Sequence, residues 1–401
     1  MKVFDELVGQ QHIVKSLQDA VTSSRNGEET QEMTHAWLFT GPPGSGRSSA
    51  AVAFAAALIC PNDGCGICID CRTAMAGGHA DVEVIRTEGL SIKIDEVREL
   101  LQRVAWSPSV GGWRVVVMED ADRLTESAAN AMLKAIEEPG SRTVWLLCAP
   151  TLHDVLPTIR SRCRHLQLRT PSTDAVAEVL IRRDGISPGM ADFAARVSQG
   201  HIGRARHLAI NESIRGRRNT IMKLPLGITD IASAFKAAAT LVELATEEAN
   251  TQSEARDEKE SQELAQAWGQ GATGRGMATG GSKALKELEK EQKSRATRMV
   301  RDSLDGALLD IATLYRDVMM VQADNATIGA DQTNSANSAP SSNEAQSLIN
   351  KELANEIAAL ADRLPPHATV EKINAIMKAR TNLSFNAAPL LTIEALMCAL
   401  A

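Results

Sequence analysis

The chain has 401 residues, a formal net charge of −7 and a hydrophobic content of 44%. This length predicts two or three domains with ordinary cores. The negative charge excludes a protein that is basic over its whole surface, and an aromatic content of 3% argues against extended stacking on single-stranded nucleic acid. We find no secretory signal and no run of about 18 apolar residues, so we expect a cytoplasmic protein without a membrane span.

The first part of the chain alternates expected helices with short apolar strands. Residues 3–25 have helical spacing of apolar side chains. Strands are expected at Ala36–Thr40, Asp81–Thr87, Trp113–Met118, Thr143–Cys148 and His165–Leu168, and helices at Ser49–Ile59, Ile94–Val104 and Thr125–Glu138. Continuous apolar runs are typical of parallel strands that are covered on both faces. Residues 30–170 therefore predict an α/β domain with a largely parallel sheet and helices on both faces.

The second part is predicted to be helical with two interruptions. Residues 171–215 form a small helical segment, and 216–246 together with 300–401 form a longer helical one. Between these, residues 247–299 are a charged and glycine-rich insertion that we expect to be flexible. Residues 322–345, rich in Asn, Ser and Ala, are predicted to be a disordered loop.

A glycine-rich loop follows the first expected strand and opens a helix. The loop reads Gly41-Pro42-Pro43-Gly44-Ser45-Gly46-Arg47-Ser48, and Ser49 continues into the helix. In this context the backbone N–H groups and the helix dipole favour a phosphate group, with Ser48 on the magnesium side. Arg47 stands where a lysine is usual, and its planar fork differs from a compact ammonium. ATP with Mg²⁺ is therefore a candidate ligand whose hydrolysis we doubt; the alternative is a loop that serves only the fold.

Two carboxylates, Glu119 and Asp120, end the expected strand Trp113–Met118. At the carboxyl end of a parallel strand, they belong near a Mg²⁺–nucleotide. Without the glycine-rich loop upstream, an ordinary polar strand end would be the default interpretation.

Four cysteines follow the helix in the spacing C-x4-C-x2-C-x2-C: Cys60, Cys65, Cys68 and Cys71. Four close thiolates suit a tetrahedral Zn²⁺ ion, and four protein ligands leave no open position for catalysis. The spacing therefore predicts a structural zinc knuckle over residues 60–71, and unrelated buried thiols are the alternative.

Several of these motifs together resemble a known family, the bacterial DNA polymerase III clamp-loader subunits, and among them the delta-prime type with an actinobacterial-like character. The resemblance rests on the following stretches: Leu7-Val8-Gly9-Gln10, the phosphate loop, the cysteine knuckle, residues 115–139 (VVVMEDADRLTESAANAMLKAIEEP), Ser161-Arg162-Cys163, and residues 379–396 (ARTNLSFNAAPLLTIEAL).

The resemblance implies an AAA+ domain over 1–170, a helical lid over 171–215 and an all-α collar over 216–246 and 300–401. It implies a hetero-pentamer with delta and gamma/tau type subunits, which loads a sliding clamp onto primer–template DNA in the cytoplasmic replisome using ATP. In that family the delta-prime member is a stator, and Arg162 corresponds to the arginine that it supplies to a neighbour's ATP site. The chain would then belong to a polymerase holoenzyme without being its polymerase subunit.

Four departures from active family members fall in this chain's own nucleotide site. They are Arg47 in the loop, the reversed order of Glu119 and Asp120, Ala149-Pro150 where a polar γ-phosphate sensor is expected, and Gly203 at the position of the lid arginine. We therefore expect weak or absent ATP hydrolysis at this site. Two alternatives stay open: a self-contained AAA+ ATPase motor, and a zinc-dependent module that binds nucleic acid.

Overall fold

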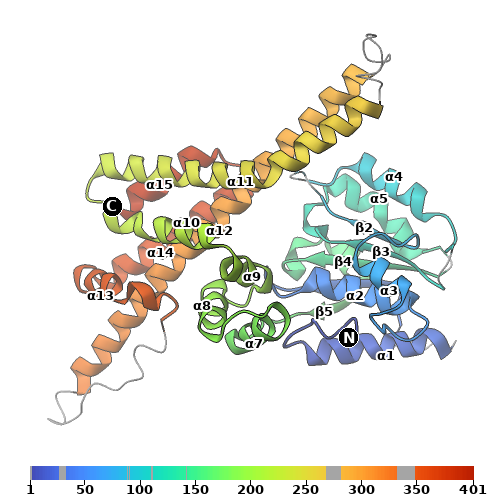
Figure 1. The fold of residues 1–401 in the computed structure, drawn as a ribbon, viewed down its shortest axis with the longest axis horizontal. Coiled ribbons are helices and arrows are strands. Elements are labelled where there is room, and N and C mark those ends of the chain that lie inside the picture. The colour runs from blue at the N-terminus through green and yellow to red at the C-terminus, as the bar shows by residue number, and fades with distance from the viewer. Residues whose placement is uncertain are drawn as a thin grey trace. The chain divides into compact units, whose positions relative to one another are not determined.

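The computed structural model describes residues 2–26, 33–87, 89, 91–109, 112–140, 142–267, 281–331 and 348–401. The chain divides into two compact units, Met1–Ile210 and Asn211–Ala401, which we describe separately (Figure 1). Across the described ranges, no helix has both the length and the apolar character needed to cross a membrane.

The first unit is built on a sheet of five parallel strands. The strands are β1 (Ala36–Thr40), β2 (Val82–Ile85), β3 (Arg114–Met118), β4 (Thr143–Ala149) and β5 (Arg164–Gln167). Their spatial order is β2-β3-β4-β1-β5, so β1 lies between the central strand β4 and the edge strand β5. The end of β1 therefore places the glycine-rich loop at the carboxyl edge of the sheet, between the ends of β4 and β5.

Helices cover both faces of the sheet because successive side chains of a strand point to opposite faces. On one face, Trp37 and Phe39 share a core with α1 (Gln11–Asn26) and α2 (Arg47–Ile59). On the other face, Leu38 shares a core with α4 (Ile94–Val104) and α5 (Glu126–Glu137). Every residue of β1 and β4 is buried. The predicted α/β fold class is confirmed.

Local chemistry fixes several element ends. Thr125 is the N-cap of α5, and its Oγ1 accepts a hydrogen bond of 3.3 Å from the N–H of Ala128. Residues 3–10 form turns rather than the start of a helix, with Phe4 and Leu7 buried. A short helix, α3 (Ile69–Met75), lies inside the cysteine knuckle and was not predicted.

The rest of the first unit is helical. It comprises the 3₁₀ turns η1 (Ala121–Arg123) and η2 (Leu152–Asp154) and the helices α6 (Pro157–Arg160), α7 (Thr173–Asp184), α8 (Pro188–Ser198) and α9 (Ile202–Ile210). Helices α7, α8 and α9 contact one another, as expected for the small helical segment at 171–215.

The second unit is all helical in its described residues. It contains α10 (Glu212–Lys223), η3 (Pro225–Gly227), α11 (Ile231–Ala267), α12 (Gly281–Asp331), η5 (Lys351–Leu353), α13 (Ala354–Arg363), α14 (Pro366–Ser384) and α15 (Pro389–Leu400). Leu241, Ile311, Ile357, Ile376 and Ile393 meet in its core.

A buried polar cluster ties three parts of the second unit together. Arg218 on α10 donates to Asp310 on α12 at 3.1 Å and also bonds Asn350. Asp317 is fully buried and accepts the N–H of Asn350 at 2.7 Å. Because buried charges cost free energy unless they are paired, this cluster specifies where α10 and the segment before α13 pack on α12.

Two predicted irregular segments are more helical than expected. In 247–299, helix α11 continues to Ala267 and α12 begins at Gly281, while 268–280 lie outside the described residues. Arg295 is buried between the two helices and pairs with Asp257 and Glu260, which gives these polar helices a contact that periodicity could not reveal. In 322–345, α12 extends to Asp331, and 332–345 lie outside the described residues.

Candidate functional site

The glycine-rich loop has the predicted strand–loop–helix setting, between β1 and α2. Gly44 and Gly46 have φ of 85° and 87°, in the left-handed region that favours glycine. At Gly44 a Cβ would lie 2.5–2.6 Å from the Cα, Cβ and Cγ of His201, so the loop and the residue before α9 are in close contact. Only glycine fits at this position.

Arg47 turns back onto the loop that it follows. Its Nη1 donates a hydrogen bond of 2.8 Å to the carbonyl oxygen of Gly41. A lysine ammonium at this position would reach outward to the β- and γ-phosphates of a nucleotide. Here one end of the guanidinium is bound to the protein's own backbone instead.

His201 closes the other side of the loop. Burial lowers the pKa of its imidazole, and the cations Arg204 and Arg47 lower it further. Its Nδ1 accepts the N–H of Arg204 at 3.2 Å. The ring is therefore neutral at pH 7, and it packs on Gly44 as an uncharged group.

Gln10 holds the loop from beneath. This residue is 1% exposed, and its Nε2 donates to the carbonyl oxygens of Arg169 at 2.6 Å and Ser45 at 3.3 Å. Its Oε1 accepts the N–H of Arg169 at 3.2 Å. One buried amide thus joins the phosphate loop to the chain that leaves β5.

The predicted carboxylates lie at the end of β3 and already have arginine neighbours. Glu119 accepts from Nε of Arg86 at 2.9 Å, and Asp120 pairs with Arg123 at 3.9 Å. A third carboxyl, Asp122, is mostly buried; desolvation raises its pKa, and the nearby Asp120 charge adds to this effect. A magnesium ion would have to compete with these arginines.

The position expected for a γ-phosphate sensor carries no side-chain donor. Ala149 ends β4, and the carbonyl oxygen of Pro150 accepts the N–H of Gly41 at 3.1 Å. Backbone therefore fills the place where a polar side chain would be needed.

Arg162 lies outside this group. Its Nη1 donates to the carbonyl oxygen of Thr158 at 2.7 Å, and its Nη2 pairs with Glu137 at the end of α5. The side chain is 39% exposed. The structure thus brings the loop and the carboxylates to one edge of the sheet and presents Arg162 at the surface, where it bonds Thr158 of α6 and Glu137 of α5.

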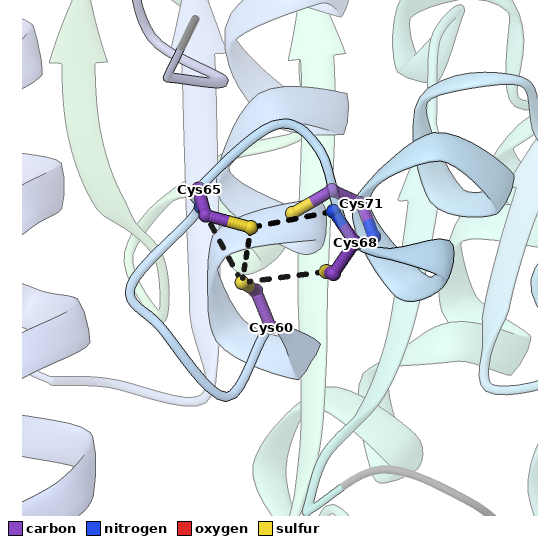
Figure 2. A group of neighbouring side chains, drawn as sticks. All are labelled: Cys60, Cys65, Cys68 and Cys71. Carbon is purple, nitrogen blue, oxygen red and sulfur yellow. Dashed lines mark hydrogen bonds between the residues drawn. The ribbon is translucent and has the colours of Figure 1, made fainter.

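The four cysteines converge as predicted (Figure 2). Their Sγ atoms all lie within 4.8 Å of one another, and Cys60 Sγ is 3.7 Å from the Sγ atoms of both Cys65 and Cys68. Metal–sulfur bonds of about 2.3 Å in a tetrahedron separate the sulfurs by about 3.8 Å. The group therefore fits a tetrahedral metal ion.

Cys65, Cys68 and Cys71 differ in how readily their thiols lose the proton that a metal ion must displace. The N–H groups of Ile67 and Cys68 lower the pKa of Cys65 to about 6, which favours its thiolate form. Burial raises the pKa of Cys71 and Cys68. An ion that favours thiolates would have to overcome that cost, which makes affinity dependent on pH.

The knuckle is fastened to the N-terminal part of the first unit. Arg25 on α1 donates to the carbonyl oxygens of Cys60 and Pro61 and pairs with Asp63 at 2.7 Å. The N–H of Val3 donates to Gly64 at 3.0 Å. A small loop that could not bury a core of its own is thereby held on the body of the domain.

Comparison with known proteins agrees with these motifs. Residues 10–172 match the family model for the DNA polymerase III delta subunit. The delta' subunit of Bacillus subtilis is 30% identical over 202 residues, which cover 50% of this chain and 61% of that protein. The delta' subunit of Pseudomonas aeruginosa is 37% identical over 171 residues, or 41% of this chain and 52% of that protein. Residues 10–172 are thus similar to DNA polymerase III subunits of the delta and delta' type.

A solved structure was also matched at low similarity. It is a gamma subunit-related protein from Thermotoga maritima, 17% identical with a TM-score of 0.36, and the match covers 91% of this chain and 99% of that chain. The similarity to DNA polymerase III subunits rests on the sequence matches. The chain spans less than two thirds of the B. subtilis and P. aeruginosa relatives.

Within the first unit, sequence reasoning missed three contact residues. They are His201 on the loop, Gln10 beneath it and Glu137 beside Arg162. Gln10 belongs to the stretch Leu7-Val8-Gly9-Gln10, which contributed to the family resemblance but did not indicate this contact. For His201 and Glu137 the sequence holds no signal, because each acts on a residue far away along the chain.

We expect Gly44→Ala to destabilise the first unit more than Gly46→Ala. Both positions carry the cost of a left-handed conformation, about 1–2 kcal/mol for a non-glycine residue. At Gly46 a Cβ meets nothing within 4 Å, whereas at Gly44 it overlaps His201 and adds about 1–3 kcal/mol. Urea unfolding followed by tryptophan fluorescence reports this unit, since four of the five tryptophans lie in it. Equal midpoints for the two variants would contradict the described contact.

Proposed function

We propose that this chain is a clamp-loader subunit of delta-prime type, which works as a stator and acts on a partner's nucleotide through Arg162. The observation that carries the proposal is the contrast between two arginines. Arg47, in the chain's own phosphate loop, is bonded to the loop backbone, whereas Arg162 is exposed. The family match of residues 10–172 supports the same role.

The chain's own nucleotide site is proposed to be weak or silent in hydrolysis. Arg47 is bonded to Gly41, and His201 packs against Gly44. Glu119 and Asp120 have arginine neighbours, which lowers their value as magnesium ligands. Gly41, Gly46, Ser48 and Ser49 keep the shape of the loop, so passive binding of ATP with Mg²⁺ is compatible with the proposal, but turnover is not expected.

The chemistry of an arginine supplied to another subunit follows from its charge and shape. Phosphoryl transfer spreads negative charge over the γ-phosphate oxygens, and a guanidinium from outside can stabilise that charge. An exposed arginine just after a short helix is suited to this task, because Ile159 of α6 is 1% exposed and fixes that helix in the core.

The partners follow from the same proposal. They are delta and gamma/tau type subunits in a hetero-pentamer, and through them a sliding clamp and primer–template DNA in the cytoplasmic replisome. The all-helical second unit would supply the collar for assembly, and α7–α9 would be the lid. The chain itself would add no polymerase chemistry.

We further propose that the cysteine knuckle binds one structural Zn²⁺ ion. Four sulfur ligands at the observed separations suit zinc and leave no position open for a substrate. The ion would hold the knuckle, together with Arg25 and Val3, against the domain.

Replacing Arg162 with alanine should leave the chain folded but lower ATP hydrolysis by the reconstituted complex about 10³-fold or more at the site that it completes. The partly exposed Arg160, two residues earlier on α6, provides the matched control, and Arg160→Ala should retain the rate. Single-turnover hydrolysis in the assembled complex measures the difference. An unchanged rate for Arg162→Ala would exclude Arg162 as the finger.

Replacing Cys65 and Cys68 with serine should lower the zinc content from one ion per chain to none, because two of four ligands are lost. It should also increase proteolysis between residues 60 and 80, which the ion would otherwise hold together. The exposed Cys398, which belongs to the second unit, is the control, and Cys398→Ser should keep the zinc content at one ion per chain. Elemental analysis of the purified protein decides the point, and a wild-type chain without zinc would overturn the proposal.

A further inference from the structure

The guanidinium of Arg162 is not oriented toward solvent alone. Nη1 donates to the carbonyl oxygen of Thr158 at 2.7 Å and to Oγ of Ser161 at 3.3 Å, and Nη2 pairs with a carboxylate oxygen of Glu137. An arginine side chain has five N–H groups. Three of them are therefore directed at acceptors of the same chain.

Arg162 and Glu137 are both held in place by neighbouring residues that are buried in the core. Glu137 is the last residue of α5, directly after Ile136, which is fully buried. Arg162 follows α6, and its N–H donates to the carbonyl oxygen of Ile159 at 3.0 Å. Ile136 and Ile159 belong to the same core cluster. The packing of Ile136 against the same core as Ile159 therefore fixes the separation between Glu137 and Arg162.

A carboxylate and a phosphate offer a guanidinium the same pair of anionic oxygens. The acceptor that holds Arg162 now is therefore chemically a substitute for the one it is proposed to meet in a partner. We propose that Glu137 is a positioning residue, which holds the guanidinium of Arg162 on its own chain until assembly brings a triphosphate within reach. This inference rests on the proposed function of Arg162.

The strength of the pair suits such an exchange. The Arg162 and Glu137 side chains are 39% and 45% exposed, so the pair is weak and is screened by salt. A highly charged triphosphate can displace it. Removing the Glu137 charge should therefore raise the equilibrium constant for the unpaired Arg162 side chain by about 1.5- to 5-fold. This factor corresponds to the free energy measured for exposed ion pairs.

The first test uses the isolated full-length chain and does not depend on the proposed function. The rate at which phenylglyoxal modifies Arg162 is measured by peptide mapping in wild type, Glu137→Gln and Glu138→Gln. Glu138 is also exposed, adjacent in sequence and carries the same charge, so it controls for net charge. We expect a rise of about 1.5- to 5-fold for Glu137→Gln and none for Glu138→Gln. Equal rates in wild type and Glu137→Gln would overturn the inference.

The second test uses the reconstituted complex with its delta and gamma/tau type partners. Glu137→Gln should raise the rate of ATP hydrolysis at subsaturating ATP by a similar factor, and the gain should shrink at high salt. A folding defect cannot raise a rate, so the gain separates positioning from a structural role. A lower or unchanged rate would overturn the inference, whereas an unchanged rate for Arg162→Ala would instead overturn the proposed function.

Discussion

The phosphate loop is closed by two contacts within the first unit, one made by Arg47 and one made by His201, and the rest of the site depends on them. Arg47 donates to Gly41, and His201 packs on Gly44 so closely that no Cβ can be added there. A neutral histidine and a backbone-bonded guanidinium replace the mobile cation that an active phosphate loop offers to a nucleotide. The remaining features of the site agree with this closure, since Glu119 and Asp120 have arginine neighbours and Pro150 places backbone where a sensor would stand.

Residues near the start of the chain also hold the phosphate loop and the cysteine knuckle in place. Gln10 joins the loop to the chain after β5, while Val3 and Arg25 hold the cysteine knuckle that follows α2. Residues of the first 25 positions thus contact both the phosphate loop and the cysteine knuckle, which follow each other in the sequence. A metal ion in the knuckle would stabilise the end of α2, and the loop at its start would then sit on a fixed helix. Such rigidity suits the proposed role as a stator.

Much of the fold could be predicted from the sequence, because parallel buried strands leave a strong local signal. The strand Ala36–Thr40 and the helix Ile94–Val104 have the predicted bounds. The cysteine cluster was also predictable, since its ligands lie within a dozen residues. The helical hairpin of α11 and α12 was not, because its buried contact is an arginine, Arg295, and not an apolar stripe. His201 and Glu137 were missed for a related reason: each meets its partner only through the tertiary fold.

The distinction between a stator and a motor can be measured on the chain alone. The most direct measurement is steady-state ATP turnover by the purified, isolated protein with Mg²⁺, compared with turnover by the complete reconstituted complex. The closed loop predicts turnover near background for the isolated chain and robust turnover only for the complex. Turnover by the isolated chain at the rate of the complex would contradict this account, and it would show that Arg47 and His201 leave the site open.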